Sequence, residues 1–493
     1  QIATLGGDEA NDYFGFTSAY LGDVNADGVP DFGIGGYRGS VAGRGRIKVY
    51  SGDDGSLIHH ILGPVGGNLG LVFAVGDVNG DGYDDFGGNH AFGFARGTIF
   101  SGLDGSELVH TPMSYLFGGV GDRDGDGHAD YVSRSSDSGV GTTFRVISGS
   151  DGSELFDLST GSGWFAGFLG DVNGDGLNDY GTVVSTSSQD SIIEIHSGDS
   201  NAVFFHLGAP RRRVQNVYGI GDSNGDGFPD LAVAFDDGQS VDVCSGHDGT
   251  VLMALRDIPL NWFSSGYNSL SGVPDADGDG HADFIVATAP PRLYSGRTGA
   301  LIAEFLRDSG QTSTHSVAGL PDANGDGWPE VVVGSPGIFD PISFGGTAAL
   351  YSYDGPAGSS FCPAAVNSTG APAELTASGS SSLDRNNLLL SVHSAPPTSV
   401  GIFLMGAGQQ QTPLGSGVLC VGTPGGGGIA RLPLASINSS GQMVQHFDAS
   451  APAGALGPIT AGTTRTFQAW FRDASPAGPV SNLSTAAFVT FVP

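Results

Sequence analysis

Apolar residues along this chain occur in short runs that are separated by turns rich in Gly, Asp and Ser. Five of these runs are typical of short strands: DFGIGG from Asp31, DYVSRS from Asp130, DLAVAF from Asp230, DFIVAT from Asp283 and EVVVGS from Glu330. The chain shows no heptad repeat and no long amphipathic stretch that would indicate helices. With 84 glycines in 493 residues, this pattern predicts a turn-rich, all-β protein.

A second phrase recurs between these strands and has the pattern of strand, tight turn, strand. Its copies are VYSGDDGSLI from Val49, IFSGLDGSEL from Ile99, VISGSDGSEL from Val146, VCSGHDGTVL from Val243 and LYSGRTGALI from Leu293. Asp-Gly between β-rich runs is a strong hairpin signal. The phrase therefore predicts a hairpin in each repeat.

A nine-residue acidic loop occurs seven times, at intervals of 45 to 54 residues. Every copy has oxygen-bearing side chains at positions 1, 3, 5 and 9 and Gly at position 6. Alternate residues let a tightly coiled loop aim several oxygens inward, and Gly permits the sharp turn. The copies are DVNADGVPD from Asp23, DVNGDGYDD from Asp77, DRDGDGHAD from Asp122, DVNGDGLND from Asp171, DSNGDGFPD from Asp222, DADGDGHAD from Asp275 and DANGDGWPE from Asp322.

These loops predict about seven structural Ca²⁺ ions, because a hard cation that takes 6 to 8 oxygens fits calcium better than magnesium. Position 7 varies freely, which suits a ligand offered by a backbone carbonyl. The predicted ligands are Asp23, Asn25, Asp27, Val29 and Asp31; Asp77, Asn79, Asp81, Tyr83 and Asp85; Asp122, Asp124, Asp126, His128 and Asp130; Asp171, Asn173, Asp175, Leu177 and Asp179; Asp222, Asn224, Asp226, Phe228 and Asp230; Asp275, Asp277, Asp279, His281 and Asp283; and Asp322, Asn324, Asp326, Trp328 and Glu330.

Each repeat holds four predicted strands, one on each side of the acidic loop and one on each side of the SGxDG turn. Four strands in a repeat of about 50 residues form a propeller blade, so residues 1–355 are predicted to be a seven-bladed β-propeller. The segment 2–5 aligns with a fourth strand but has no first three before it. We expect it to complete blade seven, which removes free sheet edges.

The acidic loops and the strands after them resemble FG-GAP repeats, the blades of integrin α-chain propellers and of several secreted bacterial proteins and lectins. DYFGF at Asp12 has the Phe-Gly element, and GSP near Gly334 approaches the Gly-Ala-Pro end. The other flanks, such as VYGIGD and VAGLPD, depart from the pattern. The resemblance covers roughly residues 1–355 and implies the propeller fold, but it implies no integrin-like ligand.

Residues 356–493 lack the acidic loop and are rich in Ser, Thr, Ala, Pro and Gly. Seven short strands with turn signals predict a small β-sandwich here. Their ranges are 388–394, 400–406, 417–422, 430–435, 443–449, 465–473 and 486–493. The region resembles the C-terminal module of many secreted environmental-bacterial proteins, for which a role as spacer or attachment domain is the simplest expectation.

The net charge and the cysteines limit the possible partners and the cellular location of the protein. The formal charge is −32, and 23 of the 51 acidic residues are predicted loop ligands, so nucleic acid is excluded as a partner. No run of 18 apolar residues indicates membrane insertion. Cys362 and Cys420 are candidate disulfide partners, and Cys244 is expected to be a buried apolar residue. A start at Gln1 fits a mature, secreted or cell-surface product whose signal peptide has been removed.

The loops between blades suggest a binding face opposite the acidic loops. In a four-stranded meander, the 2-3 and 4-1 connections share one face of the disc. These connections carry the aromatic residues Tyr37, Trp164, Trp262, Phe263, Phe339 and Phe344 and the arginines Arg38, Arg44, Arg96, Arg134, Arg211, Arg212, Arg213 and Arg307. Such a face suits an extracellular protein, an anionic glycan or a second copy of this chain, but polar loops are also common without function.

The sequence carries no nucleophile elbow, HExxH pair, phosphate-cradling loop or CxxC motif, and it predicts no catalytic residue. The leading hypothesis is a non-enzymatic protein for adhesion, cell-surface structure or extracellular assembly, in which head-to-tail contacts can form a filament or another homo-oligomer. One alternative is a carbohydrate-binding lectin, because each blade can repeat a pocket. A second is a polysaccharide lyase or hydrolase, because propellers also host enzymes.

Overall fold

The computed structural model describes most of the chain. The described residues are 2–8, 12–38, 43–90, 96–111, 114–137, 141–158, 164–185, 190–198, 202–209, 212–237, 239–258, 269–305, 314–337, 346–353, 355–422, 428–450, 456–475 and 478–493. Within them the regular structure is almost entirely strand, with no α-helix. None of these residues belongs to a helix that is long and apolar enough to cross a membrane.

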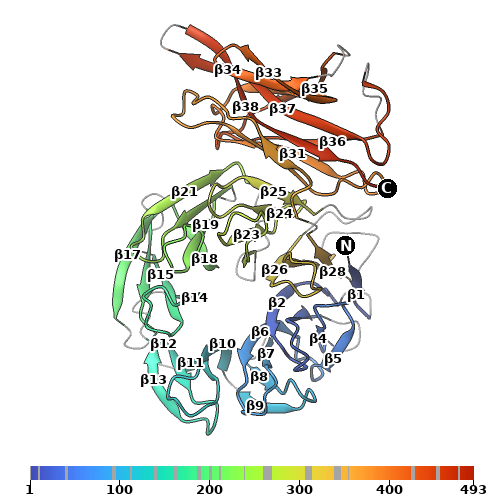
Figure 1. Ribbon diagram of the computed structural model, residues 1–493. Coiled ribbons are helices and arrows are strands. Elements are labelled where there is room, and N and C mark those ends of the chain that lie inside the picture. Colours follow the sequence, from blue (N-terminus) through green and yellow to red (C-terminus); the bar gives the residue numbers. More distant parts are fainter. Residues whose placement is uncertain are drawn as a thin grey trace. The chain divides into compact units, whose positions relative to one another are not determined.

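Seven four-stranded antiparallel sheets in the described residues form the blades of a β-propeller (Figure 1). The predicted fold class is thereby confirmed. Blade one contains β2 (Thr17–Gly22), β3 (Asp31–Gly36), β4 (Arg46–Tyr50) and β5 (Leu57–Leu62). Blade two contains β6 (Leu69–Gly76), β7 (Asp85–His90), β8 (Gly97–Phe100) and β9 (Glu107–Thr111). Blade three contains β10 (Ser114–Gly121), β11 (Asp130–Asp137), β12 (Gly141–Ile147) and β13 (Glu154–Leu158).

The remaining blades repeat this order of strands. Blade four contains β14 (Trp164–Gly170), β15 (Asp179–Ser185), β16 (Ser191–His196) and β17 (Val203–Ala209). Blade five contains β18 (Val214–Gly221), β19 (Asp230–Phe235), β20 (Ser240–Cys244) and β21 (Val251–Arg256). Blade six contains β22 (Leu270–Val273), β23 (Asp283–Val286), β24 (Arg292–Tyr294) and β25 (Leu301–Glu304). Blade seven contains β26 (Ser316–Leu320), β27 (Glu330–Ser335), β28 (Thr347–Ser352) and β1 (Ala3–Gly6).

The second strands of several blades are completely buried. Every residue of β3, β7, β19 and β27 is buried, which agrees with the continuous apolar or small character of DFGIGG, DLAVAF and EVVVGS. Small residues are needed where neighbouring blades meet. A Cβ added to Gly35 would lie 2.0 Å from the carbonyl oxygen of Gly70 in the next blade, so only glycine allows this approach.

Blade seven is completed by the N-terminal strand. β1 pairs antiparallel with β28, and Ala3 lies opposite Leu350 while Gly6 lies opposite Thr347. The last blade is therefore built from both ends of the propeller sequence. Leu5 and Leu350 share an apolar cluster with Phe14 and Phe32, so closure also buries side chains from blade one.

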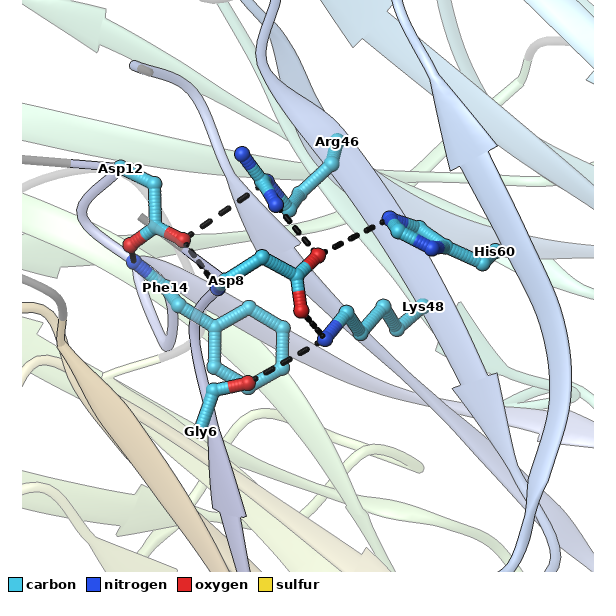
Figure 2. A network of polar contacts seen from close by, with 7 residues as sticks. All are labelled: Gly6, Asp8, Asp12, Phe14, Arg46, Lys48 and His60. Atoms are coloured by element: carbon cyan, nitrogen blue, oxygen red, sulfur yellow. Dashed lines mark hydrogen bonds and ion pairs between the residues drawn. The ribbon is translucent and has the colours of Figure 1, made fainter. Parts of the chain in front are cut away.

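A polar cluster follows this closing strand (Figure 2). The carboxylate of Asp8 pairs with Arg46, with Lys48 at 2.6 Å and with His60 at 3.2 Å. Burial raises the pKa of Asp8, but the hydrogen bonds and charges of Lys48 and Arg46 outweigh burial and leave this pKa below its usual value. Asp12 is fully buried and lies 3.6 Å from Arg46. The cluster ties the segment after β1 to the third and fourth strands of blade one.

The C-terminal region forms a β-sandwich. Its first sheet has the order β29 (Ser359–Phe361), β38 (Gly478–Thr490), β37 (Thr464–Ser475), β32 (Val400–Gly406) and β35 (Ala430–Ser436). Its second sheet has the order β30 (Glu374–Ser378), β31 (Leu388–His393) and β36 (Met443–Phe447), and β33 (Gly408–Leu414) and β34 (Gly417–Gly422) form a separate hairpin. Leu390, Phe403, Met443, Phe467 and Phe471 belong to one core cluster between the sheets.

The seven predicted strands of this region correspond to β31, β32, β34, β35, β36, β37 and the end of β38.

By compactness the chain divides into two units. One unit contains Gln1–Ala254, Ile258–Pro291 and Phe305–Tyr353, and the other contains Leu255–Asp257, Arg292–Glu304 and Asp354–Pro493.

Candidate metal centres

The seven acidic loops, residues 23–31, 77–85, 122–130, 171–179, 222–230, 275–283 and 322–330, lie between the first and second strands of the blades. All of them fold by the same internal hydrogen bonds. In the first loop, the Asp23 carboxylate accepts the backbone N–H groups of Asp27 at 3.0 Å and Gly28 at 2.8 Å. The Asp27 carboxylate accepts the N–H of Val29 at 2.8 Å. Gly28 has a φ of 86°, a conformation that favours glycine.

The same three contacts recur in the other six loops. The position 1 carboxylate accepts from positions 5 and 6, and the position 5 carboxylate accepts from position 7. The glycine at position 6 has φ between 86° and 92° in all seven loops. The spacing of Asp, Asp and Gly thus specifies one backbone shape.

Three loops bring carboxylates of different positions especially close together. Within each group, one oxygen of every residue lies within 4.8 Å of the others. The groups are Asp122, Asp124 and Asp130; Asp275, Asp277 and Asp279; and Asp322, Asp326 and Glu330. The donors are all oxygen atoms, so these groups fit a hard cation such as Ca²⁺ and do not fit a soft metal.

Position 3 is Asn in five loops, and the amide takes part in the loop. In the first, second, fourth and fifth loops its N–H donates to the position 5 carboxylate at 2.8 to 2.9 Å. In the seventh loop, Asn324 donates instead to Glu330 at 2.6 Å. The third and sixth loops have Asp at position 3 and therefore hold one more negative charge in the same space.

Position 9 has a role that the sequence did not reveal. All seven of these carboxyl groups are fully buried, and each accepts the backbone N–H of position 2 of its own loop at 2.7 to 2.9 Å. In five blades the second oxygen accepts the N–H of the glycine in the Ser-Gly turn between the third and fourth strands. The buried carboxyl group therefore joins both turns of the blade.

The glycine in the Ser-Gly turn is required by this junction. A Cβ on Gly246 would lie 1.8 Å from the carbonyl oxygen of Pro229, at position 8 of the loop. On Gly52 it would lie 2.0 Å from the carbonyl oxygen of Pro30. The recurrence of Ser-Gly in every copy of the second phrase was the sequence signal for this contact.

Burial changes the acidity of the position 9 groups. It raises the pKa of Asp31 and Glu330 to about 7 and that of Asp85 and Asp179 to about 6, although backbone hydrogen bonds act in the opposite direction. The direction is the same for Asp130 and Asp230. For Asp31, Asp85, Asp179 and Glu330 burial is the largest influence on the pKa, and nearby loop carboxylates raise it further.

Neighbouring loops also contact one another. The N–H of position 8 donates to the carbonyl oxygen of position 1 in the preceding blade, from Asp84 to Asp23 at 3.2 Å, from Ala129 to Asp77 at 2.8 Å and from Ala282 to Asp222 at 2.9 Å. The position 7 side chain lies against the position 4 glycine of the preceding loop, in the pairs His128 and Gly80, Phe228 and Gly174, His281 and Gly225, and Trp328 and Gly278. His128 and His281 are thus half-buried side chains that pack between neighbouring acidic loops.

Two arginines of the predicted binding face have acidic partners. Arg212 pairs with Asp242 at 2.6 Å and its guanidinium lies 3.3 Å from the centre of the Phe235 ring, and Arg213 lies 3.5 Å from Asp236. These contacts offset the positive charge with local partners.

The other described arginines of this face are Arg38, Arg44, Arg96 and Arg134. Arg38 is exposed above the ring of Tyr13, which packs against Tyr37 at 5.2 Å. Arg134 lies over Tyr115. Outside the described residues lie Arg211, Arg307, Trp262, Phe263, Phe339 and Phe344.

The two candidate disulfide partners, Cys362 and Cys420, are joined by a disulfide bond. Cys244 is a free, buried cysteine in an apolar cluster with Leu231 and Val233. Burial raises the pKa of its thiol to about 12, so it is protonated at neutral pH and functions as a packing residue.

Comparisons with known proteins identify no family for this chain. No family model matches the chain, and no curated protein matches it. A solved structure that is similar is the crystal structure of the β-propeller domain of Cps50 (Swd1) from Myceliophteria thermophila. It covers 70% of this chain and 97% of that chain, with 7% sequence identity and a TM-score of 0.47. The assignment of a β-propeller therefore depends on the seven sheets of the chain itself.

Proposed function

We propose that this chain is a calcium-stabilised propeller protein of the FG-GAP type that acts outside the cell without catalysis, in adhesion, surface structure or assembly. The observation that carries the calcium proposal is the burial of the carboxyl group at position 9. Seven carboxyl groups are fully buried there, each at the base of a loop that presents more carboxylates. Burying charge without a counter-charge is costly, and a divalent cation in the loop would offset this cost.

The oxygen ligands of the loop favour calcium over softer metal ions. Positions 1, 3, 5 and 9 would hold the ion with side-chain oxygens, and position 7 would add its carbonyl oxygen. Asp or Glu at three or four of these positions offers a high ligand charge, which strengthens binding of Ca²⁺. The ion would supply charge compensation and would hold the loop, and through the buried carboxyl group the Ser-Gly turn, in one arrangement.

An extracellular location is supported by two features that belong to different units. Acidic loops of this kind suit the high calcium concentration outside cells. The disulfide between Cys362 and Cys420 suits an oxidising compartment. Both features stabilise the fold by means that are scarce in the cytosol.

A non-enzymatic role is supported by how the acidic groups are used. The loop carboxylates at positions 1, 5 and 9 accept hydrogen bonds from backbone N–H groups, and a carboxylate that ligates a cation is a poor proton donor. A ring of blades and an attached sandwich then offer surfaces for binding. The mode of action is contact with a glycan or protein ligand, or with a second copy of the chain.

Calcium titration of the metal-free chain tests the metal proposal directly. Isothermal titration calorimetry should give a stoichiometry of about seven ions per chain. Asp175→Asn in the fourth loop should remove about one of them, and Asp53→Asn, at an exposed turn residue, should remove none. Absence of calcium binding would sink the proposal. Negative-stain microscopy separates the two modes of action, because single particles indicate ligand binding and elongated particles indicate assembly.

A further inference from the structure

The sandwich contains a hollow that no part of the proposed function uses. It has a volume of about 250 Å³ and is lined by Phe361, Gln409, Gln410, Gln411 and Cys420. None of these side chains is charged. Gln409 and Gln411 are exposed and Gln410 is half-buried, so the hollow presents neutral amide groups beside one aromatic ring.

A β-bulge places the three glutamines around this hollow. Gln409 lies opposite Val421 and Thr412 lies opposite Leu419, so Gln410 and Gln411 together face the single residue Cys420. In a regular strand, successive side chains point to opposite sides, and three consecutive glutamines would not share one site. A bulge redirects side chains and is common beside binding sites.

Cys420, which lines the hollow, is held in place by a disulfide bond and by buried hydrogen bonds. The disulfide links Cys420 to Cys362, the residue after Phe361. The backbone N–H of Cys420 donates to the Oε1 of Gln468 at 2.8 Å. Gln468 is fully buried, and its Nε2 donates to the carbonyl oxygens of Val418 and Ser484, both at 2.9 Å. The backbone below the glutamines is therefore rigid.

Two side chains of the hollow are supported from behind. The Phe361 ring lies 6.2 Å from the ring of Phe488. The side chain of Gln410 lies against Gly422, where an added Cβ would come within 2.8 Å of its Oε1. Glycine at this position thus leaves the space that the glutamine occupies. Preorganised groups of this kind lower the entropic cost of binding.

From this construction we infer that the hollow binds a neutral saccharide. A carboxamide offers two N–H donors and one carbonyl acceptor, which matches hydroxyl groups that both donate and accept. The aromatic ring offers an apolar surface for the C–H face of a sugar. A charged ligand would lose its hydration without gaining a counter-charge. The volume is below the roughly 300 to 1,000 Å³ of pockets for larger ligands, so the site accommodates a single sugar ring.

Saturation-transfer NMR and calorimetry on the full chain test this inference with glucose, galactose, mannose, N-acetylglucosamine and, as a charged comparison, glucuronic acid. At least one neutral sugar should bind at concentrations below roughly 10 mM. The double substitution Gln409→Ala and Gln411→Ala should weaken its binding at least about tenfold, because each lost hydrogen bond contributes on the order of 1 kcal/mol. Phe361→Leu, which keeps an apolar side chain, should weaken it as well.

The matched control is Thr412→Ala, an exposed residue on the same strand that does not line the hollow, and its binding should be unchanged. Binding should also persist in EDTA, since the site makes no use of the acidic loops, so failure of the calcium proposal would leave it standing. The inference is overturned if no neutral sugar binds, if glucuronic acid is preferred, or if the double variant binds normally. Loss of binding in EDTA would likewise overturn it, because the site would then depend on the propeller.

Discussion

The propeller and the sandwich are both antiparallel β-structures, but they are stabilised in different ways. Every propeller blade buries one carboxyl group completely at the end of its acidic loop, and in five blades this group also binds the Ser-Gly turn. The core of the sandwich is formed by apolar residues such as Leu390, Phe403 and Phe471, and a disulfide joins two of its segments. In the proposed function the first arrangement is compensated by a bound cation, whereas the second is complete once the cysteines are oxidised.

Removal of calcium is expected to have the largest effect and to separate the two regions. In excess EDTA, the melting temperature of the propeller should fall by more than about 10 °C, because each ion bound at 100 times its Kd contributes about 2.7 kcal/mol. The transition of the sandwich should stay within about 2 °C of its starting value. Differential scanning calorimetry with and without EDTA measures both. An equal shift of both transitions would contradict the comparison.

Removal of the disulfide should have the reverse selectivity. Cys362→Ala combined with Cys420→Ala opens a loop with a sequence separation of 58 residues, and the chain-entropy relation gives a loss of about 4 kcal/mol. Urea denaturation followed by near-ultraviolet circular dichroism should show the loss in the sandwich, with the propeller unaffected. Cys244→Ala serves as the control in the other region. A propeller that is destabilised by the double variant would show that the two regions are coupled.

A single added methyl group should test the junction between the turns of one blade. Gly246→Ala would place a Cβ 1.8 Å from the carbonyl oxygen of Pro229, so the turn must move away from the acidic loop at a cost of about 3 kcal/mol. Gly208→Ala is the control, because nothing lies within 4 Å of a Cβ there. Denaturant midpoints of the two variants provide the measurement. Similar midpoints would mean that the junction tolerates rearrangement.

Loss of the polar cluster around Asp8 should have the smallest effect on stability, and that effect should depend on pH. Asp8→Asn is expected to cost about 1 kcal/mol at pH 7, because Asp8 is 40% exposed and water screens its pairs with Arg46 and Lys48. The pKa of folded Asp8 is lowered. Its contribution is therefore present above the pKa of the unfolded chain and is lost as the pH falls through the folded value.

Stability curves of Asp8→Asn and the natural chain, measured from pH 7 down to about pH 3, should converge at the acid end. His60 and the buried Asp12 also face the cluster, so the comparison must be made between the two chains at each pH. Asp53→Asn, at an exposed turn residue, should show no such convergence. A difference that is constant with pH would assign the effect to packing instead of charge.

Much of the propeller could be predicted because its signals are local and repeated. The three hydrogen bonds of an acidic loop join residues at most five positions apart, and they recur in all seven copies. The same reasoning missed β33, because the sequence GQQQTPL lacks the apolar alternation of a strand, and it missed the short strands β29 and β30. It also assigned position 9 to metal alone, since the buried link to the Ser-Gly turn joins residues about 20 positions apart.

By itself, the sequence determined the all-β class, the number of blades and the loop geometry. The loop geometry depends on contacts within nine residues, where chain connectivity already holds the partners close, and the class and blade number follow from the repetition of these local signals. Tertiary structure decided which distant groups meet: the burial of Asp31 beside Gly52, the pairing of Arg212 with Asp242, and the hollow around Gln410. These depend on strand register, and a shift or a bulge of one residue sends a side chain to the opposite face of a sheet.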